Sequence, residues 1–451
     1  MIRFLKLIFM LVFMLGVFAA CGNVPDIEQV GEVDEAIEDE TADFVGWAAD
    51  IEQFREHVVR WHPRFANRAI HEREENLAIR QAFDVALDDL LLELDNLEDQ
   101  DIYIALQRAV ALLRDNHFFF TGFAGYDAPI RLLRYPLQFG WFADGFYLYR
   151  ADPDFDTALN RRLVAINGIA TDDLLPEFAR FWSVENAYDA RYQFAALLNA
   201  QGVLQAIGIH PDGAGNIVFS FEDGPTISVG YDRAANWERM PTTLRWLPPA
   251  SLVEARMEGD LPLYFQNFRQ NLWHTFVEEY GILYVCIRGW VLDTGGAFSR
   301  AVRESFDENE VRAVIIDARG NPGGDANQFA ALFRHLAQNL DEGRLFYFVN
   351  EGSNSGSLGA AYFLEDLGAV IVGQPLAQNS DFFWFGSTAP RLFLSYSRME
   401  IFPPPAFWSS QQVHGRTPED GIFRPHVLIA YTIDDWVSNR DPFWDFVVAV
   451  S

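Results

Sequence analysis

The stretch RAVIIDARGNPGGDANQFAALFRHL, residues 312–336, decides the fold of the largest part of this chain. Its apolar run from Ala313 to Ile316 is short and rich in β-branched residues, which predicts a buried strand. The run ends at Asp317, and a turn containing Gly323 and Gly324 leads into an amphipathic helix, because apolar residues then recur at helical spacing. Two adjacent glycines let the backbone bend sharply and leave amide N–H groups bare. Those amides have three possible purposes: to bind a phosphate, to bind a reacting carbonyl, or only to form the turn.

Similar strands surround this stretch. Apolar runs at Ile282–Ile287, Leu345–Val349 and Ala369–Val372 alternate with helical patterns, which predicts an α/β layer. Helices are expected from about Phe44 to Gly122, and short strands from about Pro129 to Val229. Further expected elements are a helix over 186–208, a hairpin over 386–402 and a closing helix over 441–450.

A second turn follows the expected strand Leu345–Val349. It is rich in serine and glycine, and the helix after it opens at Gly356–Leu358. A hydroxyl there would lie beside a helix N-terminus, where backbone N–H groups favour developing negative charge. The alternative is that the serine only caps the helix. This turn and the Gly-Gly turn both end neighbouring strands, and in open α/β sheets that edge is where ligands bind.

The composition excludes several classes of partner. The 451 residues carry a formal net charge of -30, which argues against nucleic acid and against an anionic membrane surface. Of the two cysteines, Cys286 lies in an expected strand and is interpreted as a buried, inert thiol. The sequence has no metal-binding His-Glu-x-x-His or Cys-x-x-Cys spacing and no nucleotide-binding glycine motif, so neither a metal nor a cofactor is expected. Nothing in the sequence indicates an oligomeric state.

The N-terminus is typical of a secretory signal over residues 1–21. Arg3 and Lys6 precede an apolar stretch that ends in small residues before Cys21. This end resembles a bacterial lipobox, which implies lipidation of Cys21 and a membrane-anchored lipoprotein of the cell envelope, outside the cytoplasm. An uncleaved membrane anchor is the alternative. Residues 22–44 are acidic and contain no arginine or lysine, so they are interpreted as a disordered tether.

The lysine content of the chain limits which catalytic mechanisms are possible. Lys6 is the only lysine of the chain, and it lies in the segment expected to be removed. A mechanism that needs a lysine is therefore excluded for the mature protein.

Several segments resemble the tail-specific, or C-terminal processing, serine peptidases. VRAVIIDARGNPGG is similar to the Gly-Gly segment of this family, and NEGSNSGSLGAAYFLEDLGAVIVGQP is similar to its serine segment. Four weaker similarities occur in the family's order: WHPRF, LLRDNHFFF, RRLVAINGIATDDLL and RTPEDGIFRPHVLI. The resemblance covers nearly everything from Phe44 to the end.

The resemblance implies a mixed α+β multidomain protein with an α/β core. The expected parts are a helical N-terminal domain over 45–125, a reduced PDZ-like β module over 126–245, and a ClpP/crotonase-like α/β catalytic core over 246–451. The implied activity is that of a serine-type peptidase that cleaves unstructured polypeptide.

Site residues follow from the same resemblance. Ser355 matches the nucleophile, and the lack of lysine places the chain with the branch similar to the tricorn protease core, in which His117 is the base. Glu419 matches the acid that orients the histidine, with Asp420 and Asp115 as further candidates. The amides of Gly356 and of Gly323 or Gly324 would form the oxyanion hole. His414 and His426 flank Glu419 and compete for the role of base.

The chain also departs from the family pattern. Leu358 replaces an acidic residue, Phe118 replaces a threonine, and His426 replaces an aspartate. These departures support an alternative in which the protein is a catalytically degenerate lipoprotein that binds peptides or another ligand.

Overall fold

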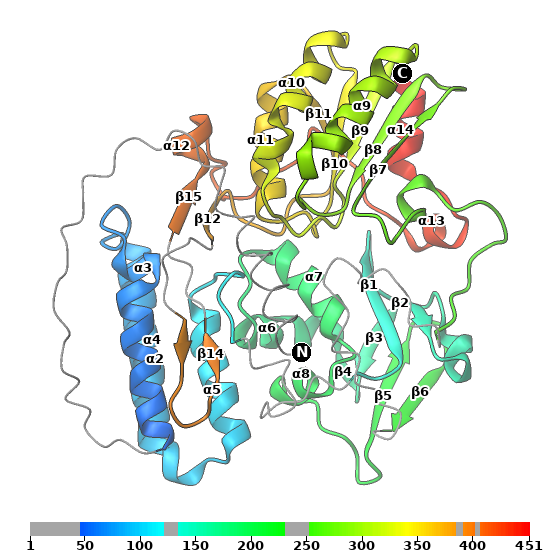
Figure 1. Ribbon diagram of the computed structural model, residues 1–451. Helices are drawn as coiled ribbons and strands as arrows, with labels where there is room; N and C mark the ends of the chain where they lie inside the picture. Colours follow the sequence, from blue (N-terminus) through cyan, green and yellow to red (C-terminus); the bar gives the residue numbers. More distant parts are fainter. Residues whose placement is uncertain (1–45, 121–133, 231–251, 385–390, 402–405) are drawn as a thin grey trace, which may run out of the picture.

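The computed structural model describes residues 46–120, 134–230, 252–384, 391–401 and 406–451 (Figure 1). The expected signal segment with Cys21 and the acidic tether lie outside the described residues, as do the expected domain boundaries at 125/126 and 245/246. Within the described ranges, no helix combines the length and the apolar character that crossing a bilayer requires.

The N-terminal part is helical, as expected. Its helices are α2 (Trp47–Trp61), α3 (Pro63–Ala66), α4 (Glu74–Glu93) and α5 (Asp99–Leu112). Helix α2 buries Ile51, Phe54 and Val58 on one face. It ends at Trp61, because His62 precedes a proline and adopts an extended conformation.

The middle part combines strands with more helix than the sequence predicts. It contains an antiparallel pair, β1 (Leu137–Phe142) and β2 (Gly145–Ala151), and a sheet in the order β4-β3-β5-β6: β4 (Ile169–Ala170), β3 (Leu163–Ile166), β5 (Asn216–Phe221) and β6 (Thr226–Gly230). Helix α6 (Thr171–Phe181) was not expected, since it contains Pro176. The single helix expected over 186–208 is divided into α7 (Ala187–Leu197) and α8 (Gln201–Ala206). The division occurs at Asn199, whose carbonyl accepts a hydrogen bond from the N–H of Tyr135.

The C-terminal part contains a six-stranded sheet in the order β16-β11-β10-β9-β8-β7. Its strands are β7 (Leu272–Val277), β8 (Ile282–Ile287), β9 (Ala313–Asp317), β10 (Leu345–Val349), β11 (Val370–Gly373) and β16 (Val427–Leu428). Only the β7–β8 pair is antiparallel. The expected α/β layer is thus confirmed, and β8 and β10 have the expected bounds.

Helices cover both faces of this sheet (Figure 1). One face packs against α9 (Ala297–Glu308), α10 (Ala330–Asn339) and α11 (Gly356–Asp366), and the other packs against α14 (Pro442–Val450). Cys286 is fully buried on the α14 side, where burial raises the pKa of its thiol to about 12. This environment agrees with the expectation of an inert thiol.

A hairpin from the C-terminal half joins the N-terminal helices. Strands β13 (Leu392–Phe393) and β14 (Glu400–Ile401) form the expected hairpin, and its residues Leu394, Met399 and Ile401 are buried in the same core as α2, α4 and α5. That core also includes the β4-β3-β5-β6 sheet, so the helical part and the strand-rich part form one packed body.

Candidate active site

Ser355 lies at the junction between the turn after β10 and helix α11. Its backbone has φ 52 and ψ -115, outside the conformations that a side-chain-bearing residue usually adopts. Such strain is characteristic of functional sites, and a nucleophilic serine at a strand-to-helix turn occurs in many hydrolases. The side chain makes no capping bond to α11, so the alternative role of a simple N-cap is not seen.

The serine turn and the Gly-Gly turn are in direct contact. A Cβ on Gly323 would lie 2.5 Å from the Cβ of Ser355, and one on Gly356 would lie 2.1 Å from the carbonyl oxygen of Gly324. Real Cβ atoms do not approach other atoms so closely, so glycine is required at both positions. The two turns therefore form one site at the carboxyl ends of β9 and β10, as predicted.

Hydrogen bonds hold the two turns in register. The Ser353 hydroxyl donates to the carbonyl of Ala318 at 2.8 Å, and the Asn354 N–H donates to the carbonyl of Asn321 at 2.9 Å. The same Asn321 carbonyl accepts from the Ser357 hydroxyl at 3.1 Å. These bonds fix the position of Ser355 relative to the Gly-Gly turn.

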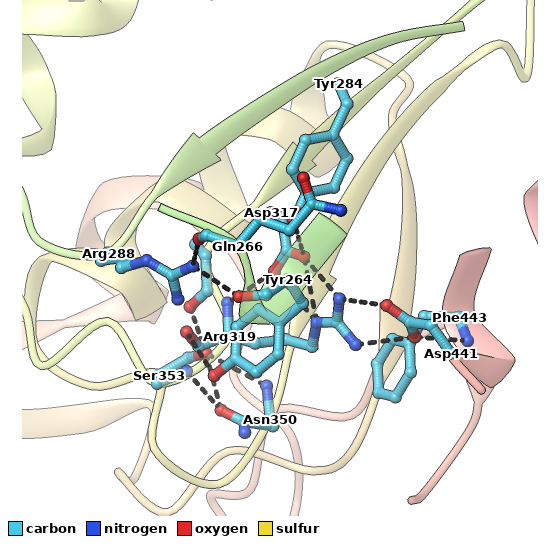
Figure 2. A network of polar contacts seen from close by, with 12 residues as sticks. Tyr264, Gln266, Tyr284, Arg288, Asp317, Arg319, Asn350, Ser353, Asp441 and Phe443 are labelled. Carbon is cyan, nitrogen blue, oxygen red and sulfur yellow. Dashed lines mark hydrogen bonds and ion pairs between the residues drawn. The ribbon is translucent and has the colours of Figure 1, made fainter. Parts of the chain in front are cut away.

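A buried network of ion pairs and hydrogen bonds surrounds Arg319, four residues before Gly323 (Figure 2). Arg319 binds both oxygens of Asp441 at 2.9 and 2.8 Å and also binds the carboxylate of Asp317, which accepts the Tyr284 hydroxyl at 2.6 Å. These carboxylates raise the pKa of the Arg319 guanidinium well above its ordinary value, against the effect of burial. Asp317 and Arg319 therefore form a buried ion pair next to the turn.

Two of the three expected oxyanion donors remain available. The N–H of Gly323 donates to the side-chain oxygen of Asn321 at 2.9 Å. Gly356 is the first residue of α11, so its N–H has no acceptor within the helix. None of the hydrogen bonds between described residues uses the N–H of Gly324 or of Gly356. Both residues lie at the contact between the two turns.

His117 reaches the site from the helical part, in the segment after α5. Its N–H donates to Asp115 Oδ1 at 2.9 Å, and its ring stacks on Phe382 of β12 (Asp381–Trp384) with centroids 5.9 Å apart. The side chain is only 11% exposed. Burial lowers the pKa of His117 below its ordinary value, and the nearby Asp115 carboxylate opposes this shift. The imidazole is therefore neutral at neutral pH.

One carboxamide connects Ser355 with His117. Gln378 Oε1 accepts a hydrogen bond from the N–H of Ser355, and Gln378 Nε2 lies 3.3 Å from His117 Nδ1. The same Nε2 lies 3.4 Å from Glu185 Oε1, and Glu185 Oε2 accepts from the N–H of Asn379 at 2.8 Å. Glu185 is buried, and burial together with Asp115 and Asp189 raises its pKa well above the ordinary value.

Solved structures share the arrangement of helices and strands described above. Mature CPAF superposes over 89% of this chain and 96% of its own, with a TM-score of 0.54 and 14% identity. CPAF complexed with lactacystin covers 89% of this chain and 97% of its own, with a TM-score of 0.53 and 13% identity. The chain has the CPAF fold. The photosystem II D1 C-terminal processing protease matches at a TM-score of 0.39 and 12% identity over 85% of this chain and 94% of its own. No protein-family profile and no curated protein matches the chain.

The predicted fold class is confirmed by this likeness and by the mixture of helices and sheets. The fold that the resemblance implied is therefore the observed one. The likeness is one of fold, and the assignment of chemistry depends on the residues of the site.

The competing histidines lie far from Ser355. His414 pairs with Asp366 at 2.7 Å, and His426 pairs with Glu365 at 3.1 Å. Both partners are in the last turn of α11, whereas Ser355 precedes its first turn, and 11 residues of helix span roughly 15 Å. Neither histidine lies where it would take a proton from Ser355. His62 is also structural, since it is fully buried and binds Asp115 Oδ2 at 3.1 Å.

The structure places Glu419 on the surface of the protein. Asp420 is exposed as well and forms an ion pair with Arg424 at 2.6 Å, which lowers its pKa to about 2. The carboxylates beside His117 belong instead to Asp115, with Oδ1 at 3.9 Å from Nδ1, and to Glu185. Sequence analysis identified neither Glu185 nor Gln378 as a site residue.

Asp115, His117 and Glu185 also have donor atoms within 4.8 Å of one another, an arrangement that could hold a metal ion. In this structure those atoms already accept or face N–H groups. Asp115 binds His62 and the His117 N–H, while Gln378 Nε2 points at His117 and Glu185. A cation would have to displace the Gln378 amide, so the residues fit a hydrogen-bonded site better than a metal site.

Proposed function

We propose that this protein is a serine peptidase that cleaves unstructured polypeptide, with Ser355 as nucleophile and His117 as base. The observation that carries the proposal is the strained Ser355 at the N-terminus of α11, in contact with the Gly-Gly turn and connected to His117 through Gln378. These parts match what acyl transfer needs: a nucleophile, a neutral base and a pair of N–H donors.

In the proposed reaction, Ser355 Oγ attacks the scissile carbonyl carbon while His117 takes its proton. The N–H groups of Gly324 and Gly356 bind the oxygen as it becomes negative, a contribution of roughly 3 kcal/mol per donor in comparable sites. His117 then gives the proton to the leaving amine. Water attacks the ester carbonyl while His117 takes its proton, and that proton returns to Ser355 Oγ as the acid product leaves. Asp115, whose Oδ1 lies 3.9 Å from His117 Nδ1, is the acid that would stabilise the charged form of the imidazole.

The test follows cleavage of an unfolded protein by wild type, Ser355→Ala and His117→Ala, with a chelator present. Each variant is expected to lose on the order of a thousandfold or more in turnover, because the two groups act as a unit. Arg424→Ala, which removes an exposed ion pair of the surface, serves as control and should keep wild-type turnover. Full activity of His117→Ala would reject that base, and loss of wild-type activity to the chelator would reject the serine mechanism.

A ligand-binding role without catalysis is the second candidate. It is favoured by the departures from the family pattern and by the position of Gln378 between Ser355 and His117. Of these departures, Leu358 gives the weakest support for a ligand-binding role. Its side chain is fully buried in the core under α11, where an acidic residue would be unpaired. A fluorophosphonate probe separates the candidates: labelling that Ser355→Ala abolishes supports the peptidase, and no labelling at any pH supports the binder.

We further propose that the mature chain is a lipoprotein outside the cytoplasm, anchored at Cys21. The basis is the signal-like N-terminus and its lipobox-like end. Cells fed a radioactive fatty acid should label the wild type and not Cys21→Ser. Equal labelling and membrane retention of the two proteins would reject the anchor.

A further inference from the structure

We propose that Gln378 is a positioning residue that holds His117 in a tautomer unable to accept the proton of Ser355, so that the site rests in an inactive state until this side chain moves. The inference rests on the proposed function, because it concerns the same serine and histidine. Its basis is the placement of one buried carboxamide against three groups: the Ser355 N–H, His117 Nδ1 and Glu185 Oε1.

The neighbours of Gln378 fix which way its amide points. The backbone N–H of Ser355 can only donate, so the atom facing it must be the acceptor Oε1. Where Glu185 is ionised, its Oε1 only accepts, so the atom facing it is then Nε2. The reversed amide would place two N–H groups together at Ser355. The contact with the Ser355 N–H therefore fixes one orientation, and an ionised Glu185 agrees with it.

This orientation determines the tautomer of His117. Gln378 Nε2 only donates, so His117 Nδ1 at 3.3 Å must accept, and the proton of the neutral ring is then on Nε2. The consequence does not depend on which ring nitrogen serves as base. If Nδ1 is the base, its lone pair is already occupied; if Nε2 is the base, it already carries a proton. In either case the imidazole cannot take the proton of Ser355.

The surroundings make this state stable. Gln378 is fully buried, the His117 ring stacks on Phe382, and Glu185 Oε2 is held by the N–H of Asn379. The alternative partner is close: Asp115 Oδ1 lies 3.9 Å from Nδ1, and a small rotation of the ring would let it accept a hydrogen bond from an Nδ1–H once Gln378 withdrew. Movement of one side chain is therefore enough to convert the ring to the tautomer in which Nε2 accepts. Substrate contacts beyond the scissile bond would supply the energy for this movement.

The tautomer is measured directly by two-bond ¹H–¹⁵N correlation spectra of the histidine rings, with His117 assigned from the spectrum of His117→Ala. We expect the wild-type ring to carry its proton on Nε2. Gln378→Leu keeps the volume but removes both hydrogen bonds, so the ring should shift toward the Nδ1–H tautomer. The rate of fluorophosphonate labelling should then rise about two- to tenfold, the range that one net hydrogen bond represents. Gln107→Leu, at a glutamine that is 1% exposed in α5, is the matched control and should change neither result.

Several outcomes decide the matter. A wild-type ring with its proton on Nδ1 overturns the proposal whatever the activity, as does a Gln378→Leu protein with an unchanged tautomer or slower labelling. If Gln378→Leu does not fold, Gln378→Ala replaces it: the methyl group cannot donate to His117 Nδ1, so the ring should shift toward the Nδ1–H tautomer, and an unchanged ring overturns the proposal. An Nε2–H ring together with no labelling of wild type or variant supports the role of Gln378 and rejects the proposed peptidase.

Discussion

The buried imidazole of His117 sets the pH range of the proposed chemistry. Burial lowers its pKa below the ordinary 6.5, and Asp115 opposes this only in part. A general base must be neutral, so activity is present above the pKa of His117 and is lost as the pH falls through it. Because the shift is downward, we expect the acid limb of kcat/KM to have its midpoint below pH 6.5. The measurement is kcat/KM for an unfolded protein substrate across the acid range, compared with the titration of the His117 ring by NMR. A midpoint above 6.5, or a kinetic limb that does not follow the ring, would contradict the assignment.

At the scale of residues, sequence analysis identified the turn residues that a local pattern specifies. Ser355, Gly324 and Gly356 belong to turns whose composition follows from their backbone geometry, and these turns do meet. Gln378 and Glu185 are different, because they are 193 positions apart and interact only through tertiary packing. No local signal distinguishes such residues from other polar residues of a loop. The same reason explains why a position matched by resemblance, Glu419, lies on the surface while other carboxylates surround His117.

The contact between the two glycine turns gives a prediction at the scale of elements. In Gly356→Ala the new Cβ would lie 2.1 Å from the carbonyl oxygen of Gly324, so the turns must separate and the oxyanion donors move apart. We expect turnover to fall on the order of a hundredfold, the loss seen when one oxyanion donor is removed. Gly359→Ala, in the same helix with nothing within 4 Å of the new Cβ, is the matched control. It should keep wild-type turnover and gain about 0.5–1 kcal/mol of stability. Equal turnover of the two variants would show that the contact has no catalytic importance.

Elements were predicted best where the hydrophobic pattern alone determines them. The expected bounds of β8 and β10 are those of the structure, because both strands are buried on both faces and read as continuous apolar runs. Prediction was worse where long-range contacts override the local pattern. The break between α7 and α8 depends on the pairing of Asn199 with Tyr135, 64 residues away, which the apolar spacing of the segment does not reveal.

The whole molecule brings together segments whose contacts no local pattern could give. The proposed base, His117, precedes Phe118 of one hydrophobic core, and the proposed nucleophile, Ser355, lies at the start of α11, which belongs to another. The β13–β14 hairpin lies far along the sequence from α2 but completes the core of the N-terminal helices. Figure 1 shows this hairpin beside α2 and α5. The N-terminal helices therefore depend on the C-terminal half of the chain for their packing.

Asp50 tests this dependence. It is fully buried in α2, and its two oxygens accept the N–H groups of Tyr396 and Ser397 in the hairpin at 2.8 and 2.7 Å. Asp50→Ala leaves both N–H groups without this acceptor and removes two charge-assisted bonds, so the free energy of unfolding should fall by about 3 kcal/mol. The measurement is urea denaturation followed by circular dichroism. Glu52→Ala in the same helix removes only a surface ion pair with Arg55 at 3.3 Å and should cost less than about 1 kcal/mol. If Asp50→Ala were as stable as Glu52→Ala, the hairpin would not hold the helices together, and the N-terminal helices would have to be stable through their own packing.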